Sequence, residues 1–519
     1  MLLPKLPYTS GASRVPVPGF YGLDRRAGAG NGAICDMTNM VGTDAPVLTS
    51  RPKRKNVRAQ TKPHGVFAAG ALFEADGTAL RRDGVSAGTV TDTDKVFAAL
   101  GERVIVFPDK KLWTAADGLH DLGATYTATG LVFSDGTYAG VSAEKNSVTT
   151  AGAAFPFRVG DGVTIPACAP TGNEAKTAVV REISADGKTL RFYENTFVEN
   201  GTVSASLTLT RSIPDLDFLC SVDNRVWGCK GDTVCCCKLG DPFNWNVFDG
   251  LSTDAWSVET GTPGDFTGCV SFMGYPVFFK ADRVFKVYGS RPQNFELMSS
   301  ATLGVLPGAD KTLTVAGETL YYLSRAGFVR YNGGYPSGVD AALDAKYTGG
   351  AAGSDGKRYY VSALRSDSVR EFLVYDPDTG LWIKEDSLAA TAFANVGPAL
   401  YAQTANAMLI VGDAPNGDEA NFASSVTFAD FDLQTFGSKY PVRLWLRMEN
   451  AGAVTVQISY NGGSCETAAT IPAATGKAVS YVPVPIRRCD RFRVKLTASG
   501  AWKLYGMEIE TRAERTRRP

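Results

Sequence analysis

The chain has 519 residues, of which 44% are apolar and 20% charged, as in an ordinary globular protein. At roughly 150 residues per domain, this length predicts about three domains, each long enough to bury a hydrophobic core. Lysine plus arginine equals aspartate plus glutamate at 53 each, so the net charge is zero. Nothing in that balance favours nucleic acid or an anionic membrane as a global partner.

The chain also lacks the usual signals for membrane insertion or export. No run of about 18 apolar residues occurs, so we expect no membrane span. The opening stretch MLLPKLPYTSG has too short an apolar run for a signal peptide. We therefore expect a protein made in the cytosol, whose ten cysteines are reduced.

Residues 1–60 are predicted to form an extended N-terminal arm. They contain six prolines and the glycine-rich stretch RRAGAGNGAICDM. Proline removes a backbone donor and glycine resists a fixed geometry, so we expect no regular sheet in the arm. Such an arm would lie along its own domain or along a neighbouring subunit.

A loose repeat begins near residue 61 and predicts a β-propeller over 61–123 and 212–419. Each unit is an apolar strand, a short turn and a second strand, often followed by a third, as in GCVSFMGYPVFFKADRVFKVYGS. Units recur every 30 to 45 residues or so, which is the spacing of propeller blades. Seven units can be distinguished, and six to eight blades fit the pattern.

Residues 124–211 do not follow the repeat. FPFRVGDGVTI and AVVREISADGKTLRFYENTF indicate a small antiparallel β-barrel or sheet, in which Asp-Gly forms a hairpin turn. We interpret this segment as a domain inserted between two blades.

Residues 420–511 alternate more regularly, as in AVTVQISYNGG and RFRVKLTASG. One apolar and one polar face per strand predict a C-terminal β-sandwich. Residues 512–519 form a basic tail. The predicted fold class is therefore all-β.

Four cysteines stand within nine positions, at Cys229, Cys235, Cys236 and Cys237. If this stretch is a hairpin, Cys235 and Cys237 share one face and Cys236 takes the other. A two-residue loop would put Cys229 with Cys236, and a three-residue loop would put it with Cys235 and Cys237. In neither register do four thiolates converge as a zinc site requires, so we expect core packing and no metal.

Other patterns offer little chemistry. His64 and His120 are far apart in apparent turns, which makes a Ser-His-Asp hydrolase hard to build. Gly187–Thr189 reads GKT, but Glu182 stands where a phosphate-binding loop needs glycine. Acidic residues are scattered, and the sequence does not show which of them converge. We expect no cofactor, no catalytic residues and no enzymatic activity.

The densest basic run is SRPKRKNVR, from Ser50 to Arg58. Its cations could contact DNA phosphates or an acidic partner, and the alternative is a solvated connector. The candidate contact residues are Arg51, Lys53, Arg54, Lys55 and Arg58.

Three stretches resemble a known family. GFYGLDRRAGAGNGAICDMTNMVGTDAPVLTSRPKR is similar to the opening of bacteriophage virion proteins described as DNA-stabilisation or tail-nozzle proteins. NRVWGCKGDTVCCCKLGDPFNWNVFDGLSTDAW and FTGCVSFMGYPVFFKADRVFKVYGS resemble their central part. The similarity covers roughly residues 17–415 and consists of structural signatures.

The resemblance implies a structural component of the virion neck or short tail. Such a protein forms a homo-oligomeric ring, expected to be a hexamer, that contacts portal, adaptor or other tail proteins. The ring would retain the packaged genome and pass it out on infection. DNA would pass through the lumen without sequence-specific binding, and the ring would be assembled in the bacterial cytoplasm. The alternatives are a tail-tip or receptor-binding propeller, a glycan-cleaving propeller enzyme, or a set of carbohydrate-binding modules that uses the sandwich.

Overall fold

The computed structural model describes residues 13–17, 19–42, 44–137, 145–169, 171–193, 195–412, 414, 416–433 and 438–513. Over these residues the chain is all-β, and its helical segments there are the short 3₁₀ turns η1 (Pro292–Asn294), η2 (Asp310–Thr312) and η3 (Ala341–Leu343). No helix in the described part is both long enough and apolar enough to cross a membrane. The chain divides into two compact units, Lys62–Asp310 and a unit that joins Met1–Thr61 to Lys311–Pro519.

The unit Lys62–Asp310 contains four-stranded antiparallel sheets with their strands in chain order. They are β6 (Pro63–Ala68), β7 (Leu72–Asp76), β8 (Ala79–Arg82) and β9 (Val85–Thr89); β10 (Val96–Leu100), β11 (Arg103–Phe107), β12 (Lys111–Thr114) and β13 (Gly118–Asp121); β22 (Phe218–Val222), β23 (Arg225–Lys230), β24 (Thr233–Cys236) and β25 (Trp256–Glu259); and β26 (Gly268–Phe272), β27 (Tyr275–Lys280), β28 (Arg283–Tyr288) and β29 (Glu296–Ala301).

Tight turns recur at equivalent places in these sheets. β22 and β23 are joined by Asp223 and Asn224, and β26 and β27 by Met273 and Gly274, all with positive φ. Two residues with positive φ make the turn that matches the right-handed twist of a hairpin. The loose sequence repeat therefore corresponds to a repeated local geometry.

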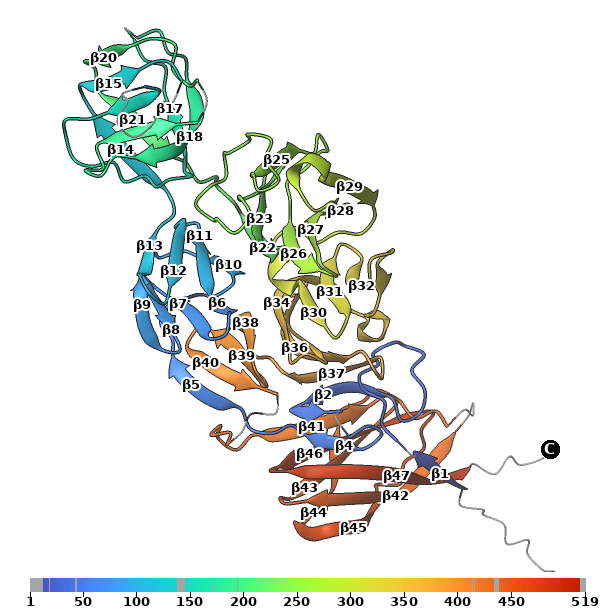
Figure 1. The fold of residues 1–519 in the computed structure, drawn as a ribbon. Coiled ribbons are helices and arrows are strands. Elements are labelled where there is room, and N and C mark those ends of the chain that lie inside the picture. Colours follow the sequence, from blue (N-terminus) through green and yellow to red (C-terminus); the bar gives the residue numbers. More distant parts are fainter. Residues whose placement is uncertain are drawn as a thin grey trace, which may run out of the picture. The chain divides into compact units, whose positions relative to one another are not determined.

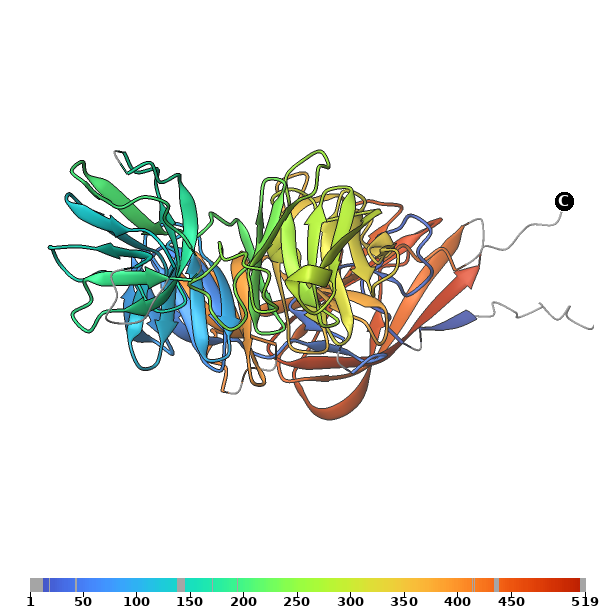
Figure 2. The ribbon, with the colours of Figure 1, turned by 45° about the horizontal axis from the view of Figure 1, so that its top comes forward.

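Neighbouring sheets of this unit share apolar layers. The first strands pack on one another, β10 against β22 and β22 against β26, and the last two sheets lie side by side in both views (Figures 1 and 2). Phe278 and Phe285 of one sheet meet Trp227 and Cys236 of the preceding one in a single buried cluster. Burial of aromatic and aliphatic side chains between sheets holds the series together.

An eight-stranded sheet occupies residues 124–211, the segment that we interpreted as an insertion. Its order is β14 (Ala124–Ala128), β21 (Leu207–Arg211), β17 (Gly162–Ile165), β18 (Lys176–Ile183), β19 (Thr189–Phe192), β16 (Ser147–Thr149), β15 (Leu131–Ser134) and β20 (Gly201–Val203). It has its own core, which includes Phe133, Phe192 and Phe197. Inside it, Arg211 pairs with the buried Asp161.

The second unit contains three further four-stranded sheets. They are β30 (Thr314–Ala316), β31 (Thr319–Ser324), β32 (Gly327–Tyr331) and β33 (Ser337–Gly338); β34 (Tyr347–Ser354), β35 (Tyr359–Arg365), β36 (Arg370–Asp376) and β37 (Leu381–Asp386); and β38 (Ala390–Val396), β39 (Ala399–Thr404), β40 (Ala407–Val411) and β5 (Lys55–Ala59). Again first strands pack together, β30 on β34 and β34 on β38.

The last of these sheets takes its outer strand from the opposite end of the chain. β5 pairs antiparallel with β40, with Arg58 opposite Met408 and Lys55 opposite Ile410. The expectation that the N-terminal arm forms no regular sheet is therefore wrong for its described part. Strand formation here depends on partners about 350 positions away along the chain, which a local sequence pattern cannot reveal.

The same correction applies to the sandwich, which is built from both ends of the chain. One sheet has the order β3 (Met40–Val41), β4 (Leu48–Ser50), β47 (Trp502–Ala513), β42 (Lys439–Asn450) and β45 (Ala474–Pro483), with β1 (Ser13–Val17) also on β47. The other has β2 (Ile34–Thr38), β41 (Ala423–Phe428), β46 (Phe492–Ser499), β43 (Val454–Tyr460) and β44 (Glu466–Ile471). Predicted bounds of 420–511 thus omit β1 to β4.

The two sheets are linked through a buried contact. Trp502 of the first sheet is 2% exposed, and its Nε1 donates to Ser424 Oγ of the second at 2.6 Å. The alternation predicted for this region is present, since Val454, Val456 and Ile458 are all fully buried. The two histidines are not turn residues: His64 lies in β6 and His120 in β13.

Candidate functional site

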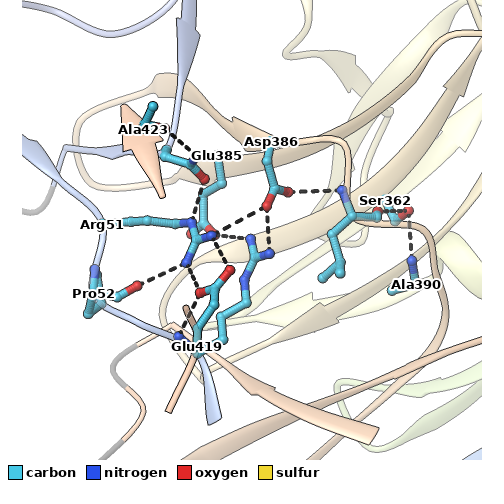
Figure 3. A network of polar contacts seen from close by, with 11 residues as sticks. Arg51, Pro52, Ser362, Glu385, Asp386, Ala390, Glu419 and Ala423 are labelled. Carbon is cyan, nitrogen blue, oxygen red and sulfur yellow. Dashed lines mark hydrogen bonds and ion pairs between the residues drawn. The ribbon is translucent and has the colours of Figure 1, made fainter. Parts of the chain in front are cut away.

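Two arginines of the basic run at Ser50–Arg58, Arg51 and Arg54, lie in a buried cluster with three carboxylates. Figure 3 shows the polar network around Arg51. Arg51 and Arg54 belong to the connector between β4 and β5. Glu385 and Asp386 end β37, and Glu419 follows the last blade-like sheet. The topology brings these residues together because β5 completes the sheet beside which they lie.

Arg51 is held by a two-pronged ion pair. Its Nη1 and Nη2 donate to the two carboxylate oxygens of Glu419 at 2.6 and 2.7 Å. Its Nε donates to Asn39 Oδ1 at 2.8 Å, and its guanidinium lies 4.0 Å from the ring centroid of Phe422. The planar guanidinium matches a carboxylate in this geometry, which gives direction as well as strength to the pair.

Arg54 bridges the two consecutive acids at the end of β37. Its Nη1 donates to Asp386 Oδ2 at 2.6 Å and its Nη2 to Glu385 Oε2 at 2.7 Å. Its backbone N–H donates to Glu419 Oε2 at 3.0 Å, so Glu419 serves both arginines. The side chain of Arg54 is 5% exposed and that of Glu385 4%.

The pKa values of this cluster are set by burial opposed by charge. Burial lowers the pKa of Arg54, but the charges and hydrogen bonds of Glu385 and Asp386 outweigh it and raise that pKa above its ordinary value. Burial raises the pKa of Glu385 more than Arg54 lowers it. Burial also raises the pKa of Glu419, but the hydrogen bonds from Arg51 and Arg54 have the larger effect and lower that pKa below its ordinary value.

A second anchor lies earlier in the arm. Arg25 Nη2 and Nη1 donate to Glu371 at 2.6 and 3.1 Å, and Tyr347 Oη donates to the same carboxylate at 2.9 Å. Burial raises the pKa of Glu371, but these partners outweigh it and lower the pKa. No motif pointed to this anchor, because its partners are 346 positions apart.

The structure separates the five basic residues predicted to contact DNA or an acidic partner into buried and accessible ones. Arg51 and Arg54 are each 5% exposed and are engaged inside the chain. Lys53 is exposed, and Lys55 and Arg58 are half-buried in β5. Lys53, Lys55 and Arg58 are less buried and stay predicted candidates for an external contact, and Arg58 also takes part in an interaction within the chain.

The cysteine-rich hairpin has the two-residue loop, with Lys230 opposite Thr233 and Trp227 opposite Cys236. Cys229 and Cys236 pack in one apolar cluster, and Cys235 and Cys237 pack in another. Among the described residues no group of three or more Cys, His, Asp or Glu is arranged to hold a metal ion. Burial raises the pKa of Cys236 and of Cys237 to about 12, which favours neutral thiols.

The adjoining stretch KLGDPFNW forms a structural turn. Asn244 is fully buried, and its Nδ2 donates to Asp241 Oδ2 at 2.6 Å. Its Oδ1 accepts from the backbone N–H of Gly162 in the insertion at 2.8 Å. The turn thus fastens the eight-stranded sheet to the four-stranded sheet of β22 to β25, which follows it in the chain.

No family model matches the chain, and no curated protein matches it. Several solved structures do. An exo-β-1,3-galactanase from Phanerochaete chrysosporium is 12% identical over 70% of this chain and 100% of that one, with a TM-score of 0.15. The endosialidase of phage phi92 is 10% identical over 81% and 64%, with a TM-score of 0.21. A family 43 arabinoxylan arabinofuranohydrolase from Bacillus subtilis is 8% identical over 87% and 96%, with a TM-score of 0.18.

These matches contradict the expectation that the chain is not an enzyme, because glycoside hydrolases and an endosialidase are prominent among them. That expectation is withdrawn. At TM-scores this low, the likeness assigns neither an activity nor catalytic residues to this chain.

Proposed function

We propose that this chain is a structural protein of a bacteriophage virion, a ring subunit of the tail nozzle or neck. In this proposal the seven four-stranded sheets are the blades of a β-propeller, and the eight-stranded sheet is a small barrel inserted between two blades. The ring, expected to be a hexamer, continues the DNA channel between portal or adaptor and the rest of the tail.

The observation that carries the proposal is the way the N-terminal arm is built into the fold. The arm holds the stretch 19–54 that resembles the opening of nozzle proteins. It completes a four-stranded sheet through β5 and adds β1 to β4 to the sandwich. Buried ion pairs at Arg25, Arg51 and Arg54 fix it along its length. Pairing between strands from opposite ends of the chain suits a subunit that carries mechanical load, since a force on one end is then shared by several sheets.

Lys53, Lys55 and Arg58 are the candidates for contacts with DNA phosphates or an acidic neighbouring protein. Phosphate contacts by lysine and arginine bind DNA without reading its sequence, as passage through a lumen requires.

The test is to find the chain in an assembled particle. Phage particles purified from the host that carries this gene are labelled with gold-conjugated antibody raised against the chain, and are imaged by electron microscopy. We expect label at the neck or along the short tail, and a six-fold ring in averaged images of that region. Label confined to the distal tip or to fibres would favour the receptor-binding alternative, and particles without the chain would overturn both.

A further inference from the structure

A groove with aromatic walls lies on the outer face of the sheet that contains β42, β45 and β47. Trp445 of β42 stands opposite Glu508 of β47 and Tyr481 of β45. Its sequence neighbours Leu444 and Leu446 are fully buried. Since side chains alternate along a strand, Trp445 points away from the core of the sandwich.

The floor of the groove is a glycine. Gly506 stands opposite Arg447, and this pair lies two residues along the strands from the pair of Trp445 and Glu508. A Cβ at Gly506 would have Val17 O, at 3.7 Å, as its nearest neighbour, so space above the backbone is open. The groove encloses about 350 Å³, and its lining includes Pro16, Trp445, Val479 and Tyr505. That volume is within the range of about 300–1,000 Å³ found for small-ligand sites.

Two arginines lie close to the ring of Trp445. Arg14 Cζ lies 4.6 Å from the Trp445 ring centroid and Arg443 Cζ lies 6.0 Å from it. Both arginines pair with Glu510, at 3.8 and 3.5 Å, in the cross-strand row on one side of Trp445. Arg447 and Gly506 belong to the row on the opposite side. Trp445 lines the groove, and its ring is held by the two arginines and by Tyr481, whose ring centroid lies 5.7 Å away.

The other wall is braced as well. Tyr505 Oη donates to Glu449 Oε1 at 2.9 Å, and Lys477 Nζ lies 3.8 Å from the Tyr505 ring centroid. Arg447 and Glu508, of opposite charge, are exposed at the rim. The groove thus combines two fixed aromatic rings with one strong donor group and one strong acceptor group.

We propose that this groove binds a neutral oligosaccharide. A pyranose ring has an apolar C–H face that packs on an aromatic ring, and a rim of hydroxyls that both donate and accept. Arg447 would donate to ring hydroxyls and Glu508 would accept from them as charge-assisted bonds. One positive and one negative group at the rim give no net charge there, which favours a neutral sugar over an acidic one. This inference does not depend on the proposed nozzle function.

The test uses the full chain and defined sugars. Maltotetraose, cellotetraose and β-1,3-galactotriose are titrated by calorimetry, with a sialylated trisaccharide as the acidic comparison. Gly506→Leu fills the groove floor without strain, since Gly506 does not have a positive φ. Trp445→Ala removes one wall. Gly349→Leu, at another glycine with open space and no positive φ, is the matched control, together with Tyr335→Ala at an exposed tyrosine elsewhere.

We expect at least one neutral oligosaccharide to bind, with affinity at least tenfold weaker in Gly506→Leu and Trp445→Ala and unchanged in the two controls. Gly506→Leu keeps the test decisive should Trp445→Ala fail to fold. No binding of the three neutral sugars at concentrations up to about 10 mM would overturn the proposal. So would binding that survives Gly506→Leu, or binding of the acidic sugar alone. A change of oligomeric state in Gly506→Leu without sugar binding would instead identify the groove as a contact between copies.

Discussion

Arg51 donates two parallel hydrogen bonds to Glu419, at 2.6 and 2.7 Å, across 368 positions of the chain. This pair joins the connector before β5 to the segment after β40, and so stabilises the pairing of β5 with β40 that completes the last four-stranded sheet. The side chain of Arg51 is only 2% exposed. Removing one partner of such a pair leaves the other without compensation for its lost hydration.

Replacing Arg51 by methionine is expected to destabilise the unit that contains the arm by about 2 kcal/mol, because Glu419 loses two charge-assisted hydrogen bonds and keeps the one from the backbone N–H of Arg54. Urea unfolding measures the loss of stability. Hydrogen exchange over residues 48–59 measures local opening, and the exchange rate in β5 should rise more than in the other strands. Lys53→Met, at an exposed neighbour, is the control and should stay within about 0.5 kcal/mol of the wild type. Equal stability of the two variants would show that the ion pair contributes nothing net.

Acid is expected to release the arm. The pKa values of Glu371 and Glu419 are lowered by their arginine partners, so the stability they add is present above their unfolded pKa, about 4.3, and is lost as the pH falls through their folded pKa. Glu385, whose pKa is raised by burial, acts with the opposite sign. Unfolding midpoints measured between pH 7 and pH 3 should fall steeply at the acid end. The Glu371→Gln variant should be less stable at pH 7, and its unfolding midpoint should fall less steeply as the pH is lowered. A pH dependence equal to that of the wild type would contradict this assignment.

The thiols of the hairpin should be inert in the native protein. Burial raises the pKa of Cys236 and of Cys237 to about 12, so few thiolates exist near neutral pH. We expect iodoacetamide at pH 8 to label the exposed Cys465 first and to label Cys236 and Cys237 only after denaturation. Peptide mass spectrometry reads out each site. Labelling of Cys236 at the rate of Cys465 would show that the two apolar clusters do not form.

A buried charge pair in the other unit gives a matched test of core electrostatics. Lys95 Nζ lies 2.6 Å from Asp109 Oδ2, and the two side chains are 0% and 2% exposed. Asp109→Asn keeps the size of the side chain but leaves the ammonium without a counter-charge. We expect a loss of about 3 kcal/mol in denaturant unfolding. Glu102→Gln, on an exposed turn nearby, should leave stability unchanged.

Part of this architecture could be predicted from local sequence because β-hairpins are local. Apolar alternation and turns such as Asp223–Asn224 identify strand pairs whose partners are adjacent in the chain. The two faces of the cysteine hairpin followed from strand periodicity once the loop length was known. Only half of the candidate site could be predicted from the sequence. Its arginines stand out as a basic run, but nothing in the sequence links Glu385, Asp386 and Glu419 to them.

Local sequence patterns were enough to predict the all-β class and the series of short strand–turn–strand units, since both depend on interactions between residues a few positions apart. The path of the N-terminal arm could be seen only in the folded chain. Its strands pair with β40, β41 and β47, and its arginines are neutralised by acids more than 300 positions away. Pairing over such separations depends on the complete fold, which brings distant donors and acceptors into register and excludes water from around them.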